Sequence, residues 1–261
     1  MFEEYFDSRQ SIIVESLGKK LAHLRNQYDY PKAFLKKSKT KTNIEITPGF
    51  WCDPVEYPKE VKSDIELDSY HRQLLFSESA EDNLLGSSSV IFWGFQTFNQ
   101  KIALFRVNRH LVGDRGKPGT SPAKIKNVLD SIRKSSSLGE AITKLSPVSQ
   151  LGRTSFASKL ISFMYPEAAG VYDSQICRGL SKFSWAKENN LVFRIDQASV
   201  SSPRIQDGYM RWCEFLSQVA EKMNDGISSG RDWSWKDPVA GSQLWRAVDV
   251  ERALFQFFRK S

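Results

Sequence analysis

The stretch LGRTSFASKLISFMYPEAAGVYDSQI, residues 151–176, decides the fold. A glycine in a tight link precedes a helical pattern of mostly small side chains that carries a single cation, Lys159. Pro166 ends this pattern, and Asp173 stands directly before the next helical pattern. Asp173 is therefore expected to cap that helix, because a carboxylate at this position accepts backbone N–H groups. Whether the acid also performs chemistry depends on its surroundings.

The expected helix over 154–164 separates apolar from small polar side chains at the helical spacing of about 100° per residue. One face carries Phe156, Leu160, Phe163 and Met164, widened by Ala157 and Ile161. The opposite face carries Ser155, Ser158 and Ser162, with Lys159 at its border. A face of serines indicates close approach by something, either a neighbouring helix or a nucleic-acid backbone.

The link SPVSQLGRTS, residues 146–155, joins two expected helices through one glycine. Such a link exposes backbone N–H groups at the N-terminus of the second helix, where the helix dipole also favours an anion. Glycine also ends helices for conformational reasons alone. The candidate DNA-binding residues of this link are Gln150, Gly152, Arg153, Thr154 and Ser155.

Hairpin, helix, proline, short loop and capping aspartate follow one another in an order that resembles the helix-hairpin-helix DNA glycosylases, and most of all the bacterial 8-oxoguanine-glycosylase-like proteins. The firm resemblance covers residues 138–183 and aligns Gly152 with the second hairpin glycine. Gln150 stands where the family has its first hairpin glycine, and Ser149 where it has a proline. Thr154 stands where bifunctional members carry their nucleophilic lysine, so the resemblance implies a monofunctional enzyme.

The resemblance implies that Asp173 is the essential carboxylate for breaking an N-glycosidic bond, since a carboxylate can stabilise positive charge on the sugar or activate water. Lys159 can hold a phosphate, pair with Asp173 or act as a relocated amine; a solvated lysine is the competing interpretation. A glycosylase flips its target base into a pocket. The candidate pocket residues, which could equally belong to the core, are Trp93, Phe95, Gln96, Tyr165 and Tyr172.

The rest of the chain predicts a mainly α protein, a helix-hairpin-helix glycosylase-like bundle with few short strands. Residues 1–67 would form an N-terminal helix over 9–28, then a basic and proline-rich irregular segment, and residues 68–261 the helical core with the hairpin. In the basic segment, PKAFLKKSKTK predicts a short helix fraying into a loop; Lys36 and Lys37 would be solvated there or contact phosphate.

Further along the chain, KIALFRV and NLVFRI alternate like strands, and DSQICRGLSKFSWAKEN predicts one helix. A long amphipathic helix is expected to end near Gly226, and VDVERALFQFFRK predicts the last helix. In the tryptophan-rich segment before that last helix, Trp233 and Trp235 are the pair expected to be exposed.

Composition fits a folded protein with a polyanionic partner. Lys plus Arg number 37 against 30 for Asp plus Glu, a net charge of +7 that favours nucleic acid. The three cysteines and three histidines are scattered, so no metal site and no cofactor are expected. Neither a signal peptide nor a bilayer-spanning apolar run is apparent, which predicts a cytoplasmic protein, and no obligatory protein partner is inferred.

Two functions therefore compete. The first is a monofunctional DNA glycosylase that excises a damaged or modified base in repair or in antiviral defence. The second is a helix-hairpin-helix module that binds DNA without chemistry. A helical basic protein with an accidental hairpin is the third interpretation.

Overall fold

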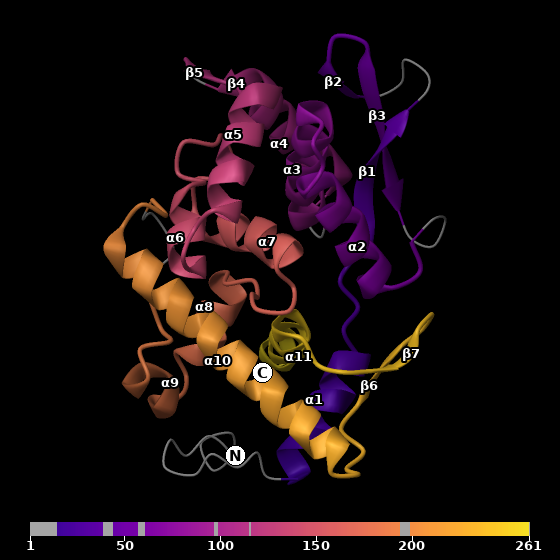
Figure 1. Cartoon of the computed structure of the whole chain (residues 1–261), viewed down its shortest axis with the longest axis vertical. Helices are drawn as coiled ribbons and strands as arrows, with labels where there is room; N and C mark the ends of the chain where they lie inside the picture. The colour runs from indigo at the N-terminus through magenta and orange to yellow at the C-terminus, as the bar shows by residue number, and fades with distance from the viewer. Residues whose placement is uncertain are drawn as a thin grey trace.

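The computed structural model describes residues 15–38, 44–56, 61–96, 99–114, 116–193 and 199–260. These residues are mainly helical, as predicted, with a few short strands (Figure 1). The helices are α1 (Glu15–Asn26), α2 (Asp64–Leu75), α3 (Ala80–Phe95), α4 (Gln100–Val112), α5 (Pro122–Arg133), α6 (Leu138–Thr143), α7 (Thr154–Met164), α8 (Ser174–Leu180), α9 (Ser184–Glu188), α10 (Pro203–Ser228) and α11 (Ala247–Lys260). The strands are β1 (Ala33–Ser38), β2 (Ile44–Thr47), β3 (Phe50–Glu56), β4 (Gly113–Asp114), β5 (Lys117–Pro118), β6 (Trp235–Asp237) and β7 (Gly241–Gln243).

The basic N-terminal segment is a strand, which corrects the expectation of a frayed helix. β1 and β2 both pair with β3 in an antiparallel sheet of order β1-β3-β2, so the segment expected to be irregular also contains regular structure. Ala33, Phe34 and Leu35 are buried, and the Leu35 N–H donates to Ser89 Oγ of α3 at 3.0 Å. Burial against α3 therefore decides the conformation of this segment over its local lysine-rich composition. Lys36 and Lys37 follow on the exposed part of β1.

Three other local expectations were wrong. KIALFRV lies inside α4, because its buried positions Ala103, Val107 and His110 follow a helical and not an alternating period. DSQICRGLSKFSWAKEN divides into α8 and α9, and Phe183 is the N-cap of the second helix. The described part of NLVFRI, residues 190–193, contains no strand, and its remainder lies outside the described residues.

The tryptophan-rich segment before α11 is buried, which corrects the expected exposure of Trp233 and Trp235. Both side chains are only 1% exposed. A Cβ atom on Gly18 of α1 or on Gly226 of α10 would lie within 2.3 Å of the Trp233 ring. Trp233 therefore fills the space that these two glycines leave between the first helix and the longest one.

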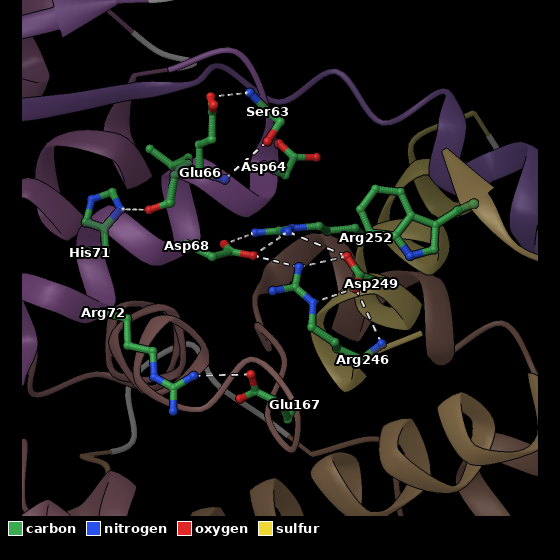
Figure 2. A network of polar contacts seen from close by, with 12 residues as sticks. Ser63, Asp64, Glu66, Asp68, His71, Arg72, Glu167, Arg246, Asp249 and Arg252 are labelled. Atoms are coloured by element: carbon green, nitrogen blue, oxygen red, sulfur yellow. Dashed lines mark hydrogen bonds and ion pairs between the residues drawn. The ribbon is translucent and has the colours of Figure 1, made fainter. Parts of the chain in front are cut away.

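A buried network of charges joins α2 to α11 (Figure 2). Asp68 of α2 accepts from Arg252 Nη1 at 3.0 Å and from Arg246 Nη2 at 2.8 Å, and Arg246 also pairs with Asp249. Arg25 of α1 bridges Asp249 to α2, where it contacts Asp64. Removing one partner from such a network leaves a buried charge unpaired, so the network specifies how the first and last helices dock.

The long helix α10 runs diagonally across the molecule, and α6 and α11 pack against it (Figure 1). α3 packs against α2, α4, α5 and α7. Helix α7 contacts α2, α3 and α6, and the next helix along the chain, α8, contacts α11. Within the described residues, no helix has the length and apolar character needed to cross a bilayer.

Candidate active site at the start of helix α8

Asp173 is both a helix cap and one half of an ion pair. Its Oδ1 accepts the N–H groups of Gln175 at 2.9 Å and Ile176 at 3.1 Å, which confirms the predicted N-cap of α8. Its Oδ2 lies 3.4 Å from Nζ of Lys159. One carboxylate oxygen is therefore fixed by the helix, while the other faces the one cation of α7.

Lys159 is buried at 5% exposure, so it is not a solvated lysine. Its ammonium also donates to Ser155 Oγ at 3.3 Å and lies 5.4 Å from the centre of the Phe156 ring. A buried ammonium requires such partners, because desolvation without them would favour the neutral amine. Of the interpretations offered for Lys159, this geometry matches the one in which the lysine pairs with Asp173.

The serine face of α7 holds the chain that leads into Asp173. Ser158 Oγ accepts the Tyr172 N–H at 3.0 Å and lies 3.2 Å from the Tyr172 carbonyl. Helix α10 holds the two preceding carbonyls: Tyr209 donates to Gly170 and Trp212 donates to Val171. The close approach indicated by the serines is thus made by the protein itself. It fixes the backbone on both sides of Val171 and so fixes Asp173.

The C-terminal end of α3 borders the lysine. A Cβ on Gly94 would lie 2.6 Å from Phe156 Cε1 and 3.1 Å from Lys159 Cδ, so only glycine leaves room for both side chains. The rings of Phe95 and Phe156 stack at 4.5 Å. Phe95 therefore contacts Phe156, whose ring in turn faces the Lys159 ammonium.

The link between α6 and α7 is a tight turn with two unusual backbone positions. Gln150 has φ +66°, in the left-handed region that favours glycine. A Cβ on Gly152 would lie 2.7 Å from the Ser146 carbonyl oxygen, so the chain approaches itself too closely for a side chain there. Arg153 is the exposed N-cap of α7 and makes no side-chain capping bond.

Helix α4 lies beside this turn and braces it. His110 Nδ1 donates to the Ser149 carbonyl at 2.7 Å, and Ser149 Oγ donates to the Arg109 carbonyl at 3.1 Å. Burial lowers the pKa of His110 to about 4, so it is a neutral brace at neutral pH. Arg106 reaches Gln150 Oε1 at 3.4 Å.

The outer face of α4 is apolar and basic. Ile102, Phe105 and Val112 are 44%, 57% and 72% exposed, three of the five large apolar side chains that are exposed in the described residues. The helix contains Lys101, Arg106 and Arg109 and no acidic residue. Arg109 pairs with Asp114 just after the helix.

One group near Asp173 was not predicted. Glu251 of α11 is 3% exposed, and its side chain packs on the backbone of Gly170, three residues before Asp173: a Cβ on Gly170 would lie 2.8 Å from Glu251 Cβ. Burial, and then the nearby charge of Asp173, raise the pKa of Glu251 to about 8, so it is protonated at neutral pH. No local pattern marks Glu251, because it reaches the site only through the packing of α11.

The candidate residues divide into those near the pair and those elsewhere. Tyr172 is fully buried, stacks on Phe193 at 3.9 Å and donates to the Leu191 carbonyl, so it is a core residue and not an accessible pocket residue. Trp93 is 5% exposed and packs on Tyr30 and Phe163, which is also a core environment.

The remaining candidates differ in their accessibility and in their distance from the pair. Gln96 is the half-buried C-cap of α3. Tyr165 follows α7 and packs edge-on against Phe76. The Thr154 side chain is fully buried, which leaves only its backbone for a direct DNA contact. Lys36 and Lys37 lie on the sheet at the right of Figure 1, on the other side of α3 from the α6–α7 turn.

Comparison of this sequence with protein-family models, with curated proteins and with solved structures found no match.

Proposed function

We propose that this protein is a monofunctional DNA glycosylase in which Asp173 drives hydrolytic release of a damaged or modified base. The observation that carries the proposal is the Asp173–Lys159 pair: a carboxylate 3.4 Å from a buried ammonium, only 18% exposed in its side chain and held by two backbone N–H groups. Charged groups that are buried and fixed in this way by their neighbours are typical of functional sites.

The chemistry follows from the two oxygens of Asp173. Cleavage of an N-glycosidic bond develops positive charge on the sugar, which an adjacent carboxylate stabilises. The same carboxylate can accept a proton from the attacking water. Because the N–H groups of α8 fix Oδ1, Oδ2 is the oxygen available for either task.

Lys159 is proposed to orient Asp173 and not to attack the sugar. A Schiff base requires an amine that reaches the sugar carbon, whereas Lys159 Nζ lies 3.4 Å from Asp173 Oδ2 and 3.3 Å from Ser155 Oγ. Thr154, at the position of the nucleophilic lysine in bifunctional relatives of the resembled family, supports the same conclusion.

The turn before α7 supports the helix-hairpin-helix assignment. Gln150 adopts the left-handed backbone that a hairpin glycine would provide, and Gly152 sits where the backbone leaves no room for a side chain. The uncapped N-terminus of α7, with Arg153 beside it, is suited to a DNA phosphate.

The outer face of α4 supports DNA as the partner. It is contiguous with the turn through Ser149 and Gln150 and carries cations without acids. Exposed apolar side chains such as Ile102 and Phe105 can contact unstacked bases while cations hold the backbone.

The alternative, a DNA-binding module without chemistry, is favoured by one observation: capping α8 alone would explain the presence of Asp173. Mass spectrometry of bases released from oxidised, alkylated and phage-modified DNA distinguishes the two. We expect the wild-type protein to release one base and Asp173→Asn to release none. Salt-sensitive binding without release from any of these DNAs would favour the binding module.

A further inference from the structure

Three half-buried aromatic rings from the two ends of the chain meet where α1 and α11 pack side by side (Figure 1). Tyr28 and Tyr30, which follow α1, lie nearly parallel, with ring centres 6.3 Å apart and an angle of 12° between their planes. The Phe255 ring of α11 stands edge-on to both, at 6.1 Å and 6.0 Å. Tyr28, Tyr30 and Phe255 are called the aromatic cluster below.

Tyr30 connects the aromatic cluster to the lysine of the candidate site. Its hydroxyl group donates to the Gly94 carbonyl of α3 at 3.3 Å. Gly94 also touches the lysine side chain, because a Cβ on this glycine would lie 3.1 Å from Lys159 Cδ. Tyr30 and Lys159 therefore contact the same residue near the end of α3.

Helix α11 connects the aromatic cluster to the aspartate of the candidate site. Gln175 Nε2 donates at 2.7 Å to the carbonyl of Phe258, which lies one turn after Phe255. Gln175 comes two residues after Asp173, and its N–H is one of the two that Asp173 Oδ1 accepts. The aromatic cluster thus adjoins both members of the Lys159–Asp173 pair.

The residue after Phe255 carries a polar atom that the described residues leave unsatisfied. Gln256 is 5% exposed, and its Oε1 is buried without a hydrogen-bond partner in the described part of the chain. Residues three and four apart share a helix face, so Gln256 lies on the same face as Arg252 and Phe255. That face meets the aromatic cluster, since the Arg252 guanidinium lies 5.7 Å from the centre of the Tyr28 ring. An unpaired buried acceptor is energetically costly, and an N–H group of a ligand would remove this cost.

We infer that the aromatic cluster and Gln256 form the binding site for the extruded base, and that this base presents an N–H group of its pairing edge to Gln256 Oε1. This inference rests on the proposed function. Aromatic rings stack on every base, so the aromatic cluster supplies affinity without selection. Gln256 supplies the selection, because a base that is alkylated at the paired nitrogen has no hydrogen to donate.

The first test requires no catalytic activity. The side-chain amide resonance of Gln256 is followed by NMR in the full-length wild-type protein during titration with 1-methyluracil and with 9-methylhypoxanthine, in which a methyl group replaces the sugar. We expect both compounds to shift this resonance. Their counterparts 1,3-dimethyluracil and 1,9-dimethylhypoxanthine lack the ring N–H and should bind about tenfold more weakly or less. No shift with either N–H compound, or equal affinities within each pair, would overturn the inference.

The second test is single-turnover base release from the DNA that the wild-type protein cleaves. Tyr30→Leu and Phe255→Leu each remove a ring, and Gln256→Leu removes the acceptor. We expect each change to slow release about tenfold or more while affinity for unmodified DNA stays the same, because the site acts only after a base is extruded. Phe257→Leu is the matched control on the same helix, since the Phe257 ring faces Lys20 and should leave the rate within about twofold of the wild type.

The two tests distinguish this inference from the proposed function. Base release that none of the three changes slows, from variants that circular dichroism shows to be folded, would overturn the inference alone. Binding of the N–H compounds without base release from any DNA would reject the proposed function alone and leave a nucleobase-binding site. If a leucine variant does not fold, the titration of the wild-type protein still decides.

Discussion

Replacing Glu251 by glutamine should remove a loss of unfolding free energy that the wild-type protein undergoes as the pH rises. The pKa of Glu251 rises from 4.5 in the unfolded chain to about 8 in the folded protein, first because it is buried and second because Asp173 is near. The folded state therefore favours the protonated form. The contribution of Glu251 to stability is complete below pH 4.5 and is lost as the pH rises toward 8.

The size of the effect follows from this shift. Between pH 5 and pH 8 the wild-type protein should lose on the order of 3 kcal/mol of unfolding free energy through this one group. Glu251→Gln has no such dependence. The stability difference between the two proteins should therefore change by the same amount over this range, whatever the fixed cost of placing an amide in the core.

Chemical denaturation at a series of pH values measures this difference directly. Glu221→Gln, a change at an exposed position of α10, is the matched control for the amide substitution and should show no comparable trend. A pH-independent difference between wild type and Glu251→Gln would refute the reasoning, because it would mean that Glu251 is ionised in the folded protein throughout this range.

Three further changes test the turn, the lysine environment and the α4 face. Gly94→Ala should cost about 1–3 kcal/mol in thermal denaturation and slow base release, because its Cβ would displace Phe156 from beside the lysine; an unchanged rate would contradict this. Gln150→Gly should stabilise the fold by about 1 kcal/mol in urea, since it relieves a left-handed backbone; destabilisation would show that the Gln150 side chain matters more. Phe105→Ala should weaken DNA binding about fivefold or more in fluorescence anisotropy without changing stability, whereas the equally exposed Leu244→Ala should not; equal effects would exclude a specific α4 contact.

Local patterns were sufficient for the elements whose signals lie within a few residues. The Asp173 cap needs only a carboxylate before a helix, and α10 and α11 follow from apolar positions at helical spacing. The turn before α7 could likewise be predicted from Gly152, because a glycine in a short link is a local signal. These are properties that a short segment carries wherever it is placed.

Contacts between distant segments could not be predicted. β1 is a strand because Leu35 meets Ser89 of α3, although its own sequence predicted a short helix fraying into a loop. Trp233 is buried because it meets Gly18 of α1 and Gly226 of α10, and Trp235 lies under the Arg25 guanidinium of α1, 4.0 Å from its ring centre. Arg25 and Asp249 are 224 residues apart in the chain and nevertheless pair. Burial by tertiary packing overrides local propensity in each case.

The candidate site shows the same division. Asp173 and Lys159 were named because their local pattern is visible, and the structure pairs them. Tyr172 was named for its position beside Asp173, but its ring turns into the core. Glu251 was missed because only the docking of α11 brings it to the Gly170 backbone.

The central claim, that Asp173 performs the chemistry, is tested most directly by single-turnover base release from the modified DNA that the wild-type protein prefers. Rate constants and DNA affinities would be measured together for wild type and Asp173→Asn. We predict a loss in rate of about a thousandfold with affinity retained, because asparagine can still cap α8 but carries no charge. Equal rates, or a loss explained entirely by weaker binding, would contradict the account and leave Asp173 as a helix cap.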